Sequence, residues 1–69
     1  MKLSARNILK GTVTNIKTGA VAAQVSIDIG GGNTITSTVT VDAVEDLGLA
    51  VGKPVNAVIK ASEIILATD

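Results

Sequence analysis

The stretch from Val21 to Val41, VAAQVSIDIGGGNTITSTVTV, decides the fold of this chain. In each half, mostly apolar residues alternate with mostly polar ones. A break of three glycines and Asn33 separates the two halves. One face of the first half carries Val21, Ala23, Val25, Ile27 and Ile29, and one face of the second carries Ile35, Ser37, Val39 and Val41. A period of two is typical of strands that bury one face. The stretch therefore predicts a β-hairpin with a glycine turn.

The flanking sequence predicts one strand before this hairpin and a short helix after it. Residues 9–16 are rich in β-branched residues and lead into a turn at Lys17-Thr18-Gly19. After the hairpin, Asp42 is placed to cap a helix over 43–47, with Glu45 in the capping-box position. Gly48 is placed to end that helix.

Two further strands are expected, at Val55–Lys60 and Ile64–Ala67. The order is then three strands, a short helix and two strands. This order predicts an all-β fold, a small five-stranded OB-like Greek-key barrel with one short helix after the third strand.

Composition limits how such a chain can be stabilised. At 69 residues it is read as a single domain, 1–69, close to the lower size limit for independent folding. It has 46% hydrophobic residues but no Cys, no His and no aromatic residue, so disulfides and common metal sites are excluded. Small domains that lack disulfides and metal sites are often stabilised by oligomerisation. We therefore expect a homo-oligomer.

Charge and hydropathy exclude two classes of partner. Six basic and six acidic residues give a net charge of zero, whereas nucleic-acid binding normally needs a basic face. Without aromatic residues, stacking on single strands is also excluded. No apolar run reaches the length of a membrane span, and no signal-peptide core is present at the N-terminus. These features predict a cytoplasmic protein with neither a nucleic-acid nor a membrane partner.

Three polar clusters have simple structural explanations. The run Gly30-Gly31-Gly32 lacks the Lys-Ser/Thr of a phosphate-binding loop, so a hairpin turn explains it better. The carboxylates Asp42, Glu45 and Asp46 fit a solvated helix start. The threonines between 34 and 40 fit the polar face of a strand, which in an oligomer could also line an interface.

Two short segments near the ends remain as candidates for binding chemistry. Ser4-Ala5-Arg6-Asn7 and Lys60-Ala61-Ser62 each supply one cation, one hydroxyl and small residues that let a ligand approach the backbone. All of these groups can donate hydrogen bonds, as an oxyanion requires. No residue is placed to act as an acid, base or nucleophile. The chain is therefore expected to bind an anion and not to be an enzyme.

The same segments carry a resemblance to a known family. Met1-Lys2-Leu3-Ser4-Ala5-Arg6-Asn7 with Leu9-Lys10-Gly11, then Asp42-Ala43-Val44-Glu45-Asp46-Leu47-Gly48-Leu49, then Val58-Ile59-Lys60-Ala61-Ser62, resemble the molbindin (Mop) family. The resemblance runs along the whole chain and implies a stand-alone Mop/TOBE-type domain with the barrel fold. It further implies a hexamer, a trimer of dimers, that holds molybdate or tungstate at subunit interfaces for molybdenum storage and homeostasis, with no organic cofactor.

Carried over residue by residue, the resemblance implies a main oxyanion site with the following members: Ser4, Ala5, Arg6, Lys60, Ala61 and Ser62. It implies tentative contacts from Thr40 and from Ala43, where many members of the family have Ser. The resemblance also implies a second kind of site, near a threefold axis, which is assigned to Gly19 and Ala20. Two alternative functions stay open: a barrel that binds a protein partner through its strand edges, and a molybdate-sensing regulator of a transporter or enzyme.

Overall fold

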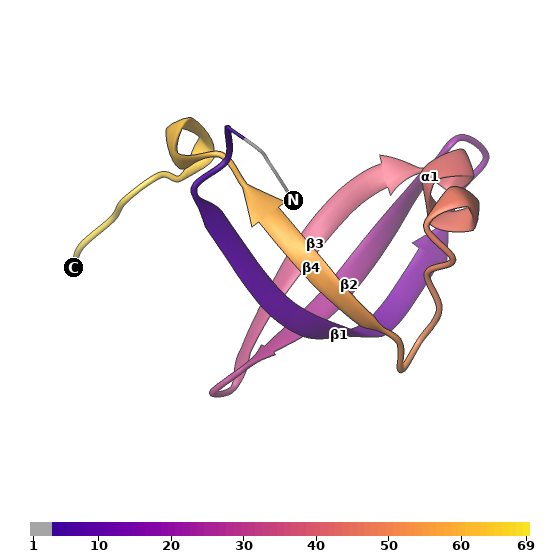
Figure 1. The fold of residues 1–69 in the computed structure, drawn as a ribbon, viewed down its shortest axis with the longest axis horizontal. Coiled ribbons are helices and arrows are strands. Elements are labelled where there is room, and N and C mark those ends of the chain that lie inside the picture. The colour runs from indigo at the N-terminus through magenta and orange to yellow at the C-terminus, as the bar shows by residue number, and fades with distance from the viewer. Residues whose placement is uncertain (1–3) are drawn as a thin grey trace.

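The computed structural model describes residues 4–69, whose main feature is one strongly curved antiparallel sheet (Figure 1). Its elements are β1 (Asn7–Thr18), β2 (Ala22–Gly30), β3 (Asn33–Thr40), α1 (Val41–Asp46), β4 (Pro54–Ile59) and the 3₁₀ turn η1 (Ala61–Glu63). The strand order is β3-β2-β1-β4, so the fourth strand returns to lie beside the first, as in a Greek key. This arrangement confirms the mostly-β, OB-like fold. Met1-Lys2-Leu3 of the N-terminal motif lie outside the described residues.

The predicted hairpin is formed by β2 and β3. Their pairing runs from Ala22 opposite Thr40 to Gly30 opposite Asn33. Gly30, Gly31 and Gly32 have φ angles of +92°, +64° and +78°, which side chains with a Cβ rarely adopt. The N–H of Gly30 also donates to Oδ1 of Asp28 at 2.8 Å. The three glycines therefore serve the turn, as the sequence predicted.

The core is small and entirely aliphatic. Val13, Ala23, Val25 and Ile27 are buried, and partly buried aliphatic side chains from β3, α1 and β4 pack around them. The prediction that Val21 lies on the buried face is wrong, because this residue is 74% exposed. The chain is still turning there, since the N–H of Gly19 donates to the carbonyl of Ala22 before β2 begins. The turn therefore starts later than predicted, after β1 has run through Lys17 and Thr18.

The short helix is present but begins earlier than expected. Thr40, not Asp42, is its N-cap, and the Thr40 hydroxyl accepts a hydrogen bond from the N–H of Ala43. The chain leaves β3 at Thr40 in an extended conformation, which a capping residue requires, so Thr40 reaches the cap position first. Gly48 follows the helix with a φ of +63°, as the sequence predicted.

The predicted fifth strand at Ile64–Ala67 is wrong for the single chain. After η1 the C-terminal segment runs away from the sheet (Figure 1), and Ile65 and Leu66 are 93% and 89% exposed. A strand needs an edge to pair with, and η1 carries this segment away from the edges that its own sheet offers.

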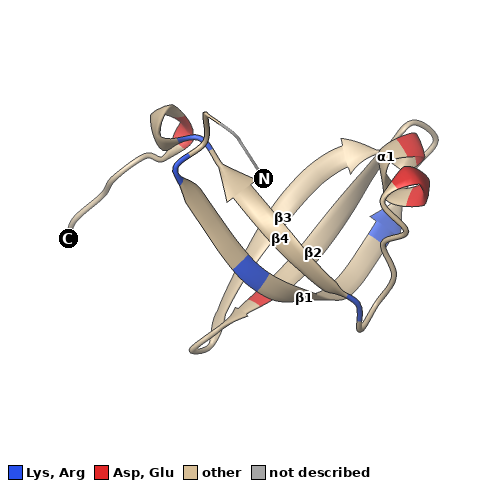
Figure 2. Cartoon of the chain, viewed as in Figure 1, with Lys and Arg blue, Asp and Glu red and all other residues tan. Residues whose placement is uncertain are grey.

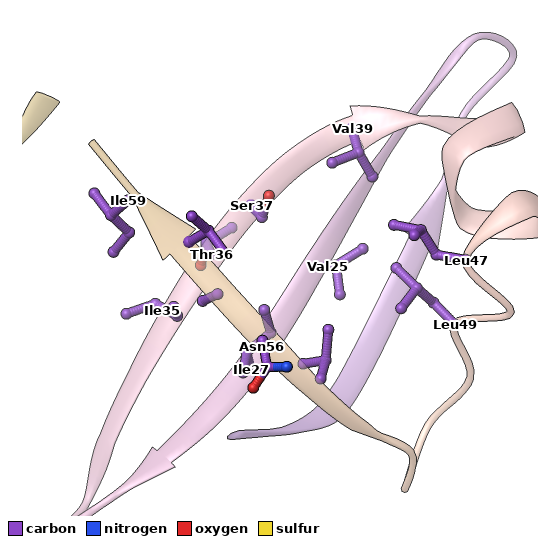
Figure 3. Close-up of a pocket in the computed structure, with 13 residues that line it drawn as sticks. Val25, Ile27, Ile35, Thr36, Ser37, Val39, Leu47, Leu49, Asn56 and Ile59 are labelled. Atoms are coloured by element: carbon purple, nitrogen blue, oxygen red, sulfur yellow. The ribbon is translucent and has the colours of Figure 1, made fainter. Parts of the chain in front are cut away.

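An apolar groove of about 510 Å³ remains open on the concave side of the sheet (Figure 3). The side chains lining it come from β2, β3, β4 and the segment after α1, and they include Ile35, Val39, Leu49 and Ile59. In the described part of the chain β3 and β4 pair with β2 and β1 but not with each other, so the barrel is not closed on this side.

Candidate functional site

The pairing of β1 with β4 brings the two predicted motifs to the same end of the sheet. The strands pair from Thr12 opposite Pro54 to Asn7 opposite Ile59, without a shift in register. Arg6 directly precedes this last pair and Lys60 directly follows it. Both chains leave the sheet beyond this pair: Ser4-Ala5-Arg6 lead into β1, and Lys60 leads from β4 into η1, which holds Ala61 and Ser62. Two segments more than fifty residues apart in sequence thus lie at the same end of the sheet. They are residues 4–6 and residues 60–62, here called the two arms.

The two arms are tied together by one side chain at their base. Nδ2 of Asn7 donates to the carbonyl of Ile59 at 3.2 Å, and both residues are half-buried. Asn7 belongs to the N-terminal motif but was not among the predicted site residues. Its place in the Ser-Ala-Arg-Asn sequence was a signal, although the partner could not be read from it.

The arm after β4 turns immediately. Lys60 is extended, with φ −66° and ψ 137°, and its carbonyl accepts a hydrogen bond from the N–H of Glu63 at 2.9 Å. This turn leaves the side chains of Lys60 and Ser62 exposed, together with Ser4 and Arg6 on the other arm, while Ala5 is half-buried. The exposed carboxylate of Glu63 lies in the same turn and offsets part of the positive charge.

The other predicted site residues, Thr40, Ala43, Gly19 and Ala20, lie together at the opposite end of β1. Ala22 pairs with Thr40, and the N–H of Val41 donates to the carbonyl of Val21, so the turn containing Gly19 and Ala20 lies beside the start of α1. The arms carry Arg6 and Lys60 with Glu63 beside them in η1, whereas α1 carries acidic residues only, next to Lys17 at the end of β1 (Figure 2). The chain therefore assembles two groups of predicted site residues, at the two ends of β1, and does not bring them together.

Other kinds of site are not found in the described residues. Within 4–69, no group of three or more His, Cys, Asp or Glu side chains is arranged to hold a metal cation. None of the helices described is long and apolar enough to cross a membrane. Hydrogen-bond donors without a matching acidic cluster make the arms suited to an anion.

These features define a small OB-like β domain that presents two cations and two hydroxyls at one end of its sheet. The chain matches the TOBE domain family over residues 3–66. It is 52% identical, over the full length of both chains, to a probable molybdenum-pterin-binding protein of Haemophilus influenzae. This chain is a member of the molbindin (Mop) family, of the TOBE domain type.

Solved structures agree with this assignment. MopII from Clostridium pasteurianum superposes with a TM-score of 0.90 at 43% identity, covering 97% of this chain and all of MopII. The cytoplasmic molybdate-binding protein ModG, solved with molybdate bound, superposes with a TM-score of 0.90 at 57% identity. That match covers 94% of this chain and 46% of the ModG chain.

Proposed function

We propose that this protein binds molybdate, and also tungstate, through the two arms at the end of β1 and β4. The observation that supports the proposal is the pairing of Asn7 with Ile59 at the last position of β1 and β4, because Arg6 and Lys60 are the residues next to this pair. The molybdate seen in ModG and the name of the Haemophilus relative support this choice of ligand.

The chemistry of the arms suits a tetrahedral dianion. Arg6 and Lys60 supply charge, the two serines supply hydroxyls, and Ala5 and Ala61 leave the backbone accessible. Hydrogen bonds to charged groups contribute roughly 1.5–3 kcal/mol each. A few of them are enough for micromolar binding, which corresponds to about −8 kcal/mol.

The proposed site is shared between copies of the chain. The donors of the arms are exposed in one copy, and the tentative contacts from Thr40 and Ala43 lie at the other end of β1. A second copy of the chain would supply the contacts from Thr40 and Ala43. The exposed apolar residues Ile65 and Leu66 and the open groove also need a cover, which a neighbouring copy would provide. We propose a hexamer built as a trimer of dimers.

The biological role proposed is cytoplasmic storage and buffering of molybdate, without catalysis and without an organic cofactor. Storage requires binding that is reversible and saturable, and it needs no acid, base or nucleophile. The apolar lining of the groove offers few polar groups to orient a substrate.

Equilibrium dialysis of the oligomer against molybdate, tungstate and sulfate tests this function, with bound molybdenum and tungsten measured by elemental analysis. We expect saturable binding of molybdate and tungstate in fixed proportion to the number of chains, and weaker binding of sulfate. Binding of sulfate as tight as that of molybdate, or the absence of saturable molybdate binding, would overturn the proposal.

A further inference from the structure

We infer that Asn7 is a positioning residue, which holds the two arms at a fixed separation and so sets the preference for molybdate over the smaller sulfate ion. This inference rests on the proposed function and deepens it. Asn7 would act through the backbone of both arms and would not itself contact the anion.

The first support is where the hydrogen bond of Asn7 lies. Among the side-chain hydrogen bonds of residues 4–69, this is the one that joins β1 to β4. It spans the last paired position, Asn7 opposite Ile59, and these two residues are the sequence neighbours of Arg6 and Lys60. A change in the spacing of the strands at this pair therefore moves the backbone from which the Arg6 and Lys60 side chains project.

The second support is the direction of the side chain. Alternation along β1 puts Asn7 on the same face as Gly11 and the buried Val13, and the side chain of Asn7 is half-buried. Arg6 belongs to the alternate positions, with the exposed Ile8. The amide of Asn7 therefore lies beneath the arms, where it can fix their spacing without competing for the ligand.

The physical effect follows from preorganisation. Sulfate and molybdate share shape and charge, so a site separates them by how well fixed donors fit the larger ion. Without the amide, the arms can close on a smaller ion, and ordering them around molybdate costs more. We therefore expect weaker molybdate binding with nearly unchanged sulfate binding, rather than an equal loss for both.

The test compares Asn7→Leu, which keeps the branched shape but removes the donor, with Thr14→Val as the matched control. Thr14 lies on the same strand and its hydroxyl donates to the carbonyl of Ser26 at 3.2 Å, a bond of the same length and type away from the arms. Asn7→Ala is measured alongside, because it removes the donor without adding apolar bulk. Each oligomer is titrated with molybdate and sulfate by calorimetry, and its thermal unfolding is recorded.

For Asn7→Leu and Asn7→Ala we expect molybdate affinity about fivefold to tenfold lower and a reduced ratio of molybdate to sulfate affinity, the size that loss of one hydrogen bond allows. Thr14→Val should keep both affinities. An unchanged ratio in the two Asn7 variants, or the same change in Thr14→Val, would overturn the role of Asn7 alone. If the unmodified protein failed to bind molybdate, the proposed function itself would fall.

Discussion

The hydroxyl of Thr40 accepts a hydrogen bond from the backbone N–H of Ala43 at 3.0 Å, and this bond starts α1 at the point where β3 ends. The next residue, Val41, donates its N–H to the carbonyl of Val21 at 2.8 Å. The start of the helix is thereby fastened to the turn between β1 and β2. Thr40 and Val41 together fix the position of Ala43, so the predicted molybdate contacts at Thr40 and Ala43 lie in an ordered part of the fold.

Replacing Thr40 with Val should destabilise the domain by about 1 kcal/mol, because the orphan N–H of Ala43 loses its capping acceptor. Thr40→Ser should retain most of the stability, since serine caps equally well. Urea unfolding at one fixed protein concentration would measure this. Thr38→Val, on the same face of β3, is the control. Equal losses for Thr38→Val and Thr40→Val would contradict a capping role.

Gly11 is predicted to tolerate no side chain. A Cβ at this position would lie 2.6 Å from the carbonyl oxygen of Asp28 and 2.6 Å from a methyl carbon of Ile27, whose side chain is buried. Because the nearest atoms are backbone and core, Gly11→Ala should cost about 1–3 kcal/mol in the free energy of unfolding. Chemical denaturation would measure the loss.

Gly32→Ala separates this clash from the general cost of replacing a glycine. Its Cβ would meet nothing within 4 Å, although its φ of +78° is strained for alanine. A Gly11→Ala protein at least as stable as the wild type would show that β1 and β2 can separate at this position.

The sequence predicted the core and the hairpin well because both follow from local alternation. The pattern through Ala23, Val25 and Ile27 is a property of consecutive residues, and it identified the buried face. The helix start was harder, since Thr40 and Asp42 are both good caps and only the path of the chain after β3 selects between them. The predicted strand at Ile64–Ala67 is absent for a different reason. Residues with a high strand propensity form a strand only where the edge of a sheet is within reach.

The spatial relation of the two arms could not be derived from local patterns. Ser4-Ala5-Arg6 and Lys60-Ala61-Ser62 are each ordinary surface tripeptides, and the resemblance to molbindins linked them without giving their geometry. The pairing of β1 with β4 brings both tripeptides to one end of the sheet, and this pairing joins segments from opposite ends of the chain. The hydrogen bond from Asn7 to Ile59 depends on the same pairing, so it could not be predicted from the sequence alone.

The C-terminal apolar residues should be needed for assembly. Ile65 and Leu66 are almost fully exposed in one chain, which is costly unless another copy covers them. We expect the double substitution Ile65→Asp, Leu66→Asp to shift the protein to smaller species in sedimentation equilibrium, while Ile65→Val, Leu66→Met keeps the assembly. A wild-type protein that stays monomeric and folded at micromolar concentration would contradict the proposed oligomer.

Arg6 and Lys60 should carry the charge of the molybdate site. Each Ala replacement removes a charge-assisted hydrogen bond, so molybdate affinity should fall roughly tenfold or more per substitution. Both side chains are exposed, and circular dichroism should show an unchanged fold. Lys53→Ala is the matched control, because Lys53 adjoins the opposite end of β4 and is also exposed. Calorimetric titration of the Arg6→Ala, Lys60→Ala double variant decides the assignment, since full affinity in that protein would place the site elsewhere.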